Sequence, residues 1–204
     1  MIAAVVLAAG CATRMGHAAP KVLLSVGERT MLSRVIAAAK ASKCGAIVVV
    51  AGSHAVAVGR EAESLGAGVV LNPRYRDGMA TSLAAGVAAL PPEVEAAVVL
   101  LGDQPCVSAA AIDRLIAAYR TTGKPMVLSR YGTVTGAPAL IARPLFPEVQ
   151  ALTGDTGARG LALRHPERVT EIPLALEEGS DIDTPDDLAR VRRALGEDRE
   201  EHGS

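Results

Sequence analysis

Valine-rich apolar runs alternate along the chain with longer segments whose apolar residues recur at helical period, and this alternation restricts the possible folds strongly. Continuous apolar runs are typical of parallel strands that are covered on both faces of a sheet. The runs predict strands at 2–7, 46–51, 69–71, 96–101, 126–129, 137–141 and 169–172. We therefore expect an α/β chain that folds as a three-layer αβα sandwich with a mostly parallel central sheet.

The intervening segments predict helices at 31–40, 55–64, 81–90, 109–120 and 185–195. Thr30, Ser108 and Thr184 stand where a hydroxyl can cap the first turn of a helix. Asp187 follows Thr184 by three positions, as in a capping box. Because no repeat and no linker-like composition interrupts the pattern, we expect a single domain over 1–195 and a polar C-terminal tail over 196–204.

Composition excludes several classes of partner. The chain has 204 residues, and 21 basic against 22 acidic residues give a formal net charge of −1, so no basic surplus is present for nucleic acid or an anionic membrane. Aromatic residues are 2% of the chain, which is too few for base-stacking platforms. No apolar stretch reaches the roughly 18 residues of a membrane span. We expect small-molecule partners, no nucleic acid and no membrane.

The cysteines indicate a reducing compartment. Cys11, Cys44 and Cys106 lie too far apart for a metal clip, and their odd number argues against a disulfide framework. The apolar start that ends at Cys11 is similar to a lipoprotein signal, but no basic residue precedes it, so we interpret it as a buried strand. We expect a cytoplasmic protein in which Cys11 is an inert buried thiol.

The loop after the first strand has the composition of a phosphate-binding loop. Small residues at 8–10 let backbone N–H groups approach a ligand at the edge where open α/β sheets bind ligands. Arg14 and Lys21 add two cations, which suits a triphosphate. The loop matches neither the dinucleotide-binding nor the P-loop pattern. From the loop alone, two solvated charges beside a structural turn are an equally good interpretation.

Two aspartate-containing stretches are candidates for metal binding. Asp103 follows the strand at 96–101, so its carboxylate is expected at the same sheet edge, and it lies too far ahead of Ser108 to cap the next helix. In the stretch 181–187, Thr184 can cap the helix and leave Asp183 free. Two carboxylates that converge on one site suit Mg²⁺, which takes its remaining ligands from phosphate and water.

A third stretch, at 72–83, enters the helix expected from residue 81. Gly78, Thr81 and Ser82 offer donors and acceptors that can read a base edge or hold a phosphate. A purely structural role, in which Thr81 or Ser82 caps the helix, fits the sequence equally well. The four histidines show no metal-ligand spacing.

These stretches together resemble a known family. Residues 7–10 (LAAG), 14–16 (RMG), 20–21 (PK), 102–105 (GDQP) and 181–188 (DIDTPDDL) are similar to motifs of the molybdenum cofactor cytidylyltransferase family, within the MobA-like NTP transferase superfamily. The resemblance implies a Rossmann-like fold of the nucleotide-diphospho-sugar transferase type. It also implies nucleotide contacts from a set of nine residues: Leu7, Ala8, Ala9, Gly10, Arg14, Lys21, Gly78, Thr81 and Ser82.

The same resemblance assigns roles in catalysis. Lys21, Arg14 and Asp103 would be catalytic, and Asp103 and Asp183 would hold Mg²⁺, or Mn²⁺, on the nucleotide phosphates. Residues 136–138, 145–148 and 154–160 look like the family's acceptor region, although the last stretch also fits a turn and a helix start. On this basis Gly136, Pro138 and Arg159 are expected to contact the acceptor.

The predicted reaction is transfer of CMP from CTP to the phosphate of molybdopterin, with release of pyrophosphate. Members of the superfamily that use GTP tend to have glycine where this chain has Ala9, and the extra methyl group favours a pyrimidine. Transfer from GTP, transfer from UTP or CTP to a sugar phosphate or another phosphate acceptor, and a nucleotide- or cofactor-binding chaperone remain as alternatives. A molybdoenzyme or its chaperone is a possible protein partner.

Overall fold

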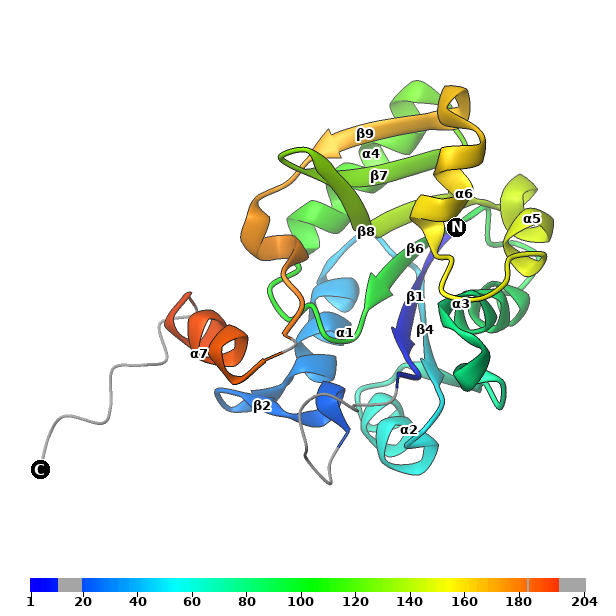
Figure 1. Ribbon diagram of the computed structural model, residues 1–204. Coiled ribbons are helices and arrows are strands. Elements are labelled where there is room, and N and C mark those ends of the chain that lie inside the picture. The colour runs from blue at the N-terminus through cyan, green and yellow to red at the C-terminus, as the bar shows by residue number, and fades with distance from the viewer. Residues whose placement is uncertain (11–19, 183, 195–204) are drawn as a thin grey trace, which may run out of the picture.

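The computed structural model describes residues 1–10, 20–182 and 184–194. Its centre is a seven-stranded sheet with the order β5-β4-β1-β6-β8-β7-β9 (Figure 1). The strands are β1 (Ile2–Ala8), β4 (Ala46–Ala51), β5 (Gly68–Leu71), β6 (Ala96–Leu101), β7 (Met126–Tyr131), β8 (Val134–Ala142) and β9 (Val169–Pro173). All seven strands expected from the apolar runs are present, most with ends extended by one to three residues.

The sheet is mostly parallel, as expected. β1 pairs in parallel with both β4 and β6, and β5 and β9 are parallel to their neighbours. β8 runs antiparallel to both β6 and β7. The carboxyl ends of β1, β4 and β6 therefore meet at one edge of the sheet, and β8 begins at that same edge.

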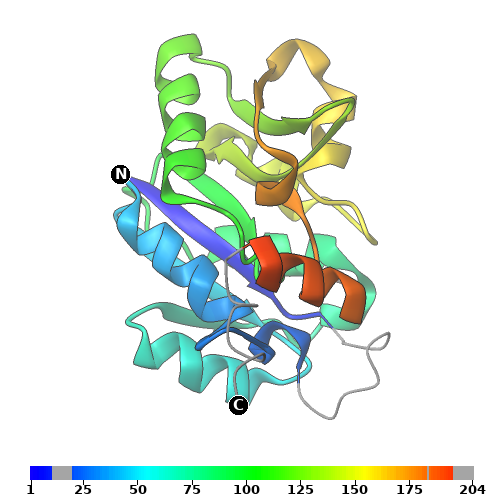
Figure 2. The same ribbon diagram turned by 90° about the vertical axis from the view of Figure 1, so that its left-hand side faces the viewer.

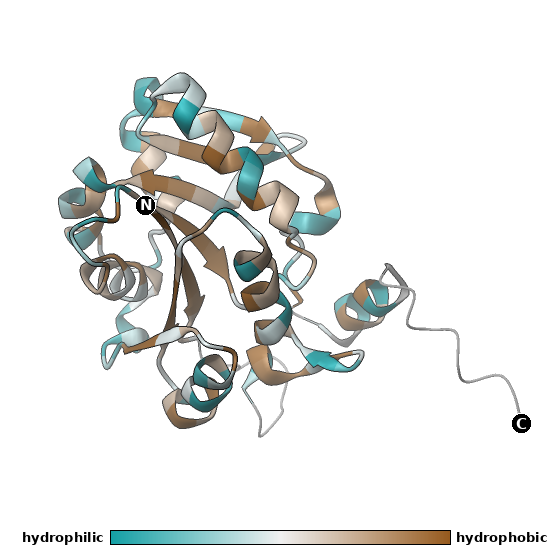
Figure 3. Cartoon of the chain, turned by 180° about the vertical axis from the view of Figure 1, so that it is seen from behind, coloured by the Kyte–Doolittle hydropathy of each residue, from teal (hydrophilic) through white to brown (hydrophobic). Residues whose placement is uncertain are grey.

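Helices cover both faces of the sheet. α1 (Met31–Ala41), α2 (Ala55–Ser64) and α4 (Ala109–Thr122) pack on one face, where α1 and α4 lie side by side (Figure 2). α3 (Met79–Ala88), α5 (Phe146–Gln150) and α6 (Ala158–Arg164) pack on the other face. Alternate residues of β1 enter the two cores, Ala4 and Val6 on one side and Ala3 and Val5 on the other. This two-sided burial accounts for the continuously apolar strands in Figure 3.

The predicted caps of three helices are confirmed. Thr30 accepts a hydrogen bond from Ser33 N at 3.0 Å, and Ser108 accepts one from Ala111 N at 3.0 Å. At α7 (Pro185–Ala194), Thr184 Oγ1 accepts from Asp187 N at 3.1 Å, and Thr184 N donates to Asp187 Oδ2 at 2.9 Å. These reciprocal bonds form the predicted capping box.

The predicted start of α3 is wrong. The helix runs from Met79 to Ala88 rather than over 81–90, because its first amides find acceptors on a distant segment. Ala80 N donates to Gly154 O at 3.0 Å, and Met79 N donates to Asp155 Oδ1 at 3.3 Å. The hydroxyls in the sequence therefore do not mark the start of this helix.

A short hairpin and a small third core were not predicted. β2 (Ser25–Val26) pairs with β3 (Arg29–Thr30) around Gly27, whose φ of 62° favours glycine. α7 lies beside this hairpin (Figure 1), and Val191 and Ile182 are buried with Val26.

The described elements also include five short 3-10 segments: η1 (Lys21–Leu23), η2 (Tyr75–Asp77), η3 (Arg143–Leu145), η4 (Pro166–Arg168) and η5 (Leu176–Gly179).

The polar tail expected at 196–204 lies outside the described residues, and the single domain over 1–195 stays a prediction. Within the part of the chain that the structure describes, none of the helices is both long and apolar enough to cross a membrane.

Candidate functional site

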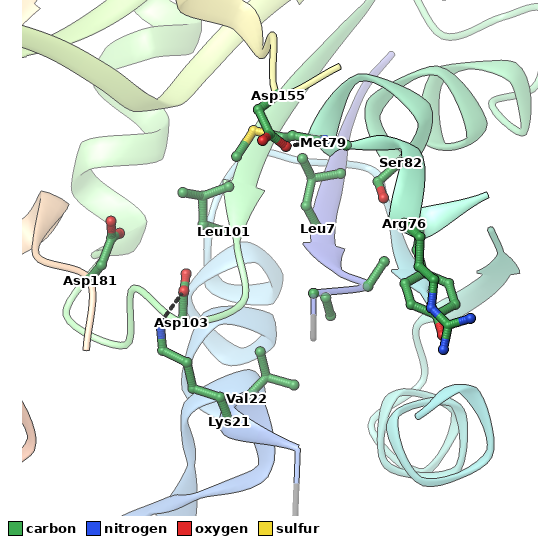
Figure 4. Close-up of a pocket in the computed structure, with 15 residues that line it drawn as sticks. Leu7, Lys21, Val22, Arg76, Met79, Ser82, Leu101, Asp103, Asp155 and Asp181 are labelled. Atoms are coloured by element: carbon green, nitrogen blue, oxygen red, sulfur yellow. Dashed lines mark hydrogen bonds and ion pairs between the residues drawn. The ribbon is translucent and has the colours of Figure 1, made fainter. Parts of the chain in front are cut away.

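A cavity of about 650 Å³ opens at the sheet edge where β1 and β6 end, and we refer to it as the first cavity (Figure 4). Its walls come from the end of β1, η1, η2, the start of α3, the end of β6 with the turn that follows it, and the two segments that carry Asp155 and Asp181. Its lining is Leu7, Ala8, Ala9, Gly10, Lys21, Val22, Tyr75, Arg76, Gly78, Met79, Ser82, Leu101, Asp103, Asp155 and Asp181. Eight of the nine residues expected to contact a nucleotide are described, and seven of these eight line this cavity.

The backbone at the end of β1 is held in place by the turn after β4. Ser53 N donates to Ala9 O at 3.3 Å, and Ser53 Oγ donates to Gly10 O at 2.9 Å. These bonds occupy the carbonyl groups of Ala9 and Gly10. The small side chains of Ala8 and Ala9 leave the neighbouring backbone accessible to a ligand.

An ion pair joins Lys21 to Asp103 inside the first cavity. Lys21 Nζ lies 2.7 Å from Asp103 Oδ2, with the two side chains 14% and 27% exposed (Figure 4). Lys21 stands at the start of η1 and Asp103 in the turn after β6, so the fold brings them together across 82 positions of sequence. The sequence predicted that both residues reach this edge, and the pairing between them is a new finding.

The two aspartate-containing stretches also meet. Ile182 N donates to Asp103 O at 3.3 Å, and the buried Gln104 donates through Nε2 to Asp181 Oδ1 at 2.8 Å and to Gly179 O at 3.1 Å. The sequence reasoning missed Gln104 and Asp181. Both lie inside the quoted motifs, but nothing in the sequence distinguished Asp181 from its neighbour Asp183.

Two of the predicted site residues cannot be placed. Arg14 lies in the segment 11–19, and this segment and Asp183 are outside the residues that the structure describes, as is Cys11. Among the described residues, no group of three or more His, Cys, Asp or Glu side chains is close enough to hold a metal ion. The donor chemistry nevertheless fits a hard divalent cation, since Asp103 and Asp181 both present carboxylates to the first cavity.

Charge also favours a bound cation. The described lining holds two basic side chains, Lys21 and Arg76, and three acidic ones, Asp103, Asp155 and Asp181. A nucleoside triphosphate would add several negative charges to a lining that is already net acidic. Divalent cations and further basic groups are the means by which such sites neutralise phosphates.

A buried asparagine organises the start of α3. Asn72 Nδ2 donates to Thr81 Oγ1 and to Ser82 Oγ, each at 2.9 Å, and Asn72 Oδ1 accepts from Arg74 N at 2.9 Å. Thr81 Oγ1 also lies 2.9 Å from the carbonyl oxygens of Arg74 and Gly78. Thr81 therefore serves local structure and does not line the cavity, whereas Ser82 does. Asn72 was not singled out in the sequence.

A second cavity, of about 410 Å³, adjoins the first. Gly136 and Arg159 line it, as expected of acceptor residues, but Pro138 does not, and Pro138 O instead accepts from Ser129 Oγ at 2.5 Å. The two cavities share the following walls: Leu7, Met79, Leu101, Asp155 and Asp181.

Tyr131 lines the second cavity with an uncharged side chain. Burial raises the pKa of the Tyr131 hydroxyl to about 12, with smaller effects from a hydrogen bond with Ser129 and from the charges of Glu178 and Asp181. The hydroxyl donates to Ala137 O at 2.8 Å. Because the proton is held up to strongly alkaline pH, Tyr131 does not act as a base near neutral pH.

Two adjoining cavities thus lie at the edge of a Rossmann-like sheet, and one of them holds a lysine–carboxylate pair, an arrangement that suits nucleotidyl transfer. Residues 4–169 match the family model of the MobA-like NTP transferase domain. The chain belongs to this family.

Similar proteins cover nearly the whole chain. A protein of Paenarthrobacter nicotinovorans named nicotine blue oxidoreductase is 32% identical in an alignment of 202 positions, which covers 93% of this chain and 96% of that protein. The structure of Rv0371C from Mycobacterium tuberculosis H37Rv in complex with manganese is 30% identical, with a TM-score of 0.76 over 94% of this chain and 97% of that one. A nucleotidyl transferase from Methanothermobacter thermautotroptrophicus (Mth528) shares the fold, with a TM-score of 0.82 at 23% identity over 96% and 97% of the two chains.

Proposed function

We propose that this nucleotidyltransferase transfers CMP from CTP to the phosphate of molybdopterin, giving the cytosine dinucleotide and pyrophosphate. The observation that carries the proposal is the Lys21–Asp103 pair in the first cavity, which shares its walls with a second cavity large enough for an acceptor. The first cavity would take the nucleotide and the second the acceptor, so that the reacting phosphates meet at the shared walls.

The reaction needs positioning and charge neutralisation more than a base. An oxygen of the acceptor phosphate, already ionised at neutral pH, attacks the α-phosphorus of CTP. The bond from that phosphorus to the bridging oxygen breaks, and pyrophosphate leaves with the electron pair. Lys21 would lie near the transferring phosphate and Arg14 near the leaving pyrophosphate, where their charges stabilise the transition state.

The metal-binding residues of this proposal are Asp103 and Asp183, with Asp181 in hydrogen-bond contact with the same turn through Gln104. When bound, Mg²⁺ or Mn²⁺ would neutralise the phosphates and polarise the α-phosphate. The manganese complex of Rv0371C supports a divalent cation in a relative of this chain. Lys21 holds the Asp103 carboxylate in position at 2.7 Å.

Ala9 favours a pyrimidine base, and Ser82 favours a base that carries a carbonyl group. Ala9 is buried and lines the first cavity, where glycine would leave more room. Ser82 accepts a hydrogen bond from Asn72, and among the described residues none accepts the Ser82 proton. That proton is therefore available to a carbonyl oxygen on the base, which cytosine, uracil and guanine carry and adenine lacks.

The walls of the second cavity suit an acceptor that has both apolar and polar parts. Apolar side chains such as Leu83, Val99 and Val134 lie beside polar ones that include Gln104, Tyr131 and Thr135. Both a pterin and a sugar phosphate would find hydrogen-bond partners there, so the acceptor experiment below decides between them. Arg159 supplies a cation for an anionic group of the acceptor.

Pyrophosphate release in the presence of each of the four NTPs, with and without molybdopterin, tests the proposal. We expect turnover that needs CTP, the pterin and Mg²⁺ or Mn²⁺ together. Preference for GTP, or release of pyrophosphate with a sugar phosphate in place of the pterin, would identify one of the alternative reactions. Tight CTP binding without turnover on any acceptor would indicate a chaperone, for which a molybdoenzyme is the expected partner. We also propose a cytoplasmic location.

The relative named nicotine blue oxidoreductase suggests a second candidate, a redox reaction at the same cavities. The same samples, incubated with NADH or NADPH and nicotine blue, test it by nicotinamide absorbance. Metal-independent oxidation of the nicotinamide, without pyrophosphate release from any NTP, would overturn the proposal of CMP transfer.

A further inference from the structure

The segment 153–157 between α5 and α6 contacts the first turn of α3, although the two are far apart in sequence. Met79 N donates to Asp155 Oδ1 at 3.3 Å across 76 positions, and Ala80 N donates to Gly154 O at 3.0 Å. The first amides of any helix lack acceptors within the helix. The distant segment therefore provides the cap that α3 does not supply itself.

Gly78 permits this contact. It stands at the N-cap position with φ 106° and ψ 171°, and no side chain caps the helix from that position. A Cβ atom at Gly78 would lie 2.2 Å from the carbonyl carbon of Gly154 and 2.8 Å from Asp155 N. The positive φ favours glycine at this position, and the absence of a side chain lets the backbones of the two segments lie directly against each other.

The contact also joins the two cavities. Gly78 and Ser82 line the first cavity, and Gly157 and Arg159 line the second. Met79 and Asp155, the two hydrogen-bonded residues, line both. Figure 4 shows the Asp155 carboxylate next to Met79 at the start of α3. The contact therefore links a wall of the first cavity to a wall of the second.

We propose that Asp155 is a positioning residue that acts through the first turn of α3. Its carboxylate holds the Met79 amide, and with Gly154 it fixes the segment from Gly78 to Ser82 for the nucleotide. The negative charge is also favourable at a helix N-terminus. The inference rests on the proposed function in one respect, that the first cavity takes the nucleotide.

Calorimetric titration of CTP with Mn²⁺ tests this role in the wild type and in the variants Asp155→Ala and Asp155→Asn. We expect Asp155→Ala to bind about five- to tenfold more weakly, as the loss of a helix cap would predict. Asp155→Asn keeps an acceptor oxygen and should bind within about twofold of the wild type. Amide hydrogen exchange of Met79 and Ala80 should be faster in Asp155→Ala and near the wild-type rate in Asp155→Asn.

Asp77→Ala is the matched control. Asp77 precedes Gly78, is exposed, and pairs with Arg74 at 2.9 Å without lining either cavity. Asp77→Ala removes one negative charge close to the start of α3, as Asp155→Ala does, but it leaves the hydrogen bond to Met79 N intact. CTP affinity should therefore stay at the wild-type value.

Three results would separate the possible failures. Equal CTP affinity in Asp155→Ala and wild type would overturn the role of Asp155. Tighter binding in both Asp155 variants would also overturn it, because the carboxylate would then act by direct repulsion of the phosphates. If the wild type binds none of the four NTPs, the proposed function fails, while amide exchange at Met79 and Ala80 still tests the cap.

Discussion

Substitution of Lys21 or Asp103 by alanine is expected to reduce turnover far more than it reduces stability. Each change breaks the 2.7 Å pair between side chains that are 14% and 27% exposed. Exposed pairs contribute at most about 1 kcal/mol to the free energy of unfolding, whereas removal of one partner from a fully buried pair costs about 3–5 kcal/mol. The partial exposure of this pair lies between these cases, so we expect a loss of about 1–2 kcal/mol. For a chain of this size that loss lowers Tm by roughly 2–8 °C.

The expected effect on catalysis is larger. Removal of one group that stabilises transition-state charge typically costs about 10²–10³-fold in kcat. A loss of about 1–2 kcal/mol leaves a domain of ordinary stability almost entirely folded, so unfolding would not account for such a decrease. The measurements are pyrophosphate release under single-turnover conditions and urea unfolding, each made on Lys21→Ala, Asp103→Ala and the double variant.

The control is Arg130→Ala, which breaks an exposed pair with Glu171 at 3.6 Å outside both cavities. It should change neither turnover nor stability measurably. If Lys21→Ala loses only about as much activity as its unfolded fraction explains, the pair is structural and does not stabilise the transition state. If both single variants and the double variant lose turnover equally, the two residues act as one unit.

Three further predictions follow from the described contacts. Asn72→Ala removes the hydrogen-bond donor to the Thr81 and Ser82 hydroxyls, so it should lower the free energy of unfolding by about 1–3 kcal/mol. It should also weaken CTP binding, and an unchanged CTP affinity by calorimetry would show that these hydrogen bonds do not contribute to nucleotide binding. Gly86→Ala places a Cβ atom 2.4 Å from Val5 Cγ1. The steric overlap should cost more than the higher helix propensity of alanine contributes, so urea unfolding should show a loss of about 1–3 kcal/mol. A variant more stable than the wild type would contradict this. The pKa of Tyr131 is raised from 10.0 to about 12 in the folded protein, so its contribution to stability is complete below pH 10 and is lost as the pH rises toward 12. Unfolding free energies measured across that range should fall less steeply in Tyr131→Phe, and identical slopes in the two proteins would refute the assignment.

The sheet and the helices α1, α2, α4 and α7 could be predicted because their signals are local, whereas α5 and α6 were not predicted. Valine-rich runs and helical period depend on nearby residues, and the caps at Thr30 and Ser108 lie next to the helices they begin. The start of α3 could not be predicted in this way, since its acceptors come from Gly154 and Asp155. The β2–β3 hairpin escaped notice because two-residue strands leave no detectable period.

The sequence predicted which residues lie at the site, because they follow the ends of parallel strands, but not how these residues pair there. Asp103 and the small residues after β1 could be expected at one edge because parallel strands end together. The pairing of Asp103 with Lys21 and of Gln104 with Asp181 depends on how the turns fold back, which no local pattern records. Likewise, Thr81 and Ser82 are adjacent in sequence, yet only Ser82 lines the cavity.

The antiparallel direction of β8 lets a single hairpin shape part of the second cavity. Because β8 starts at the edge where β1 and β6 end, Val134 and Gly136 reach the second cavity from a hairpin that leads out of β7. A hairpin can be lengthened, shortened or exchanged without a change of register between β1 and β6, whose ends lead to Lys21 and Asp103. If the second cavity takes the acceptor, as we propose, grafting this hairpin between members of the family should transfer the acceptor preference and leave the nucleotide chemistry with the recipient.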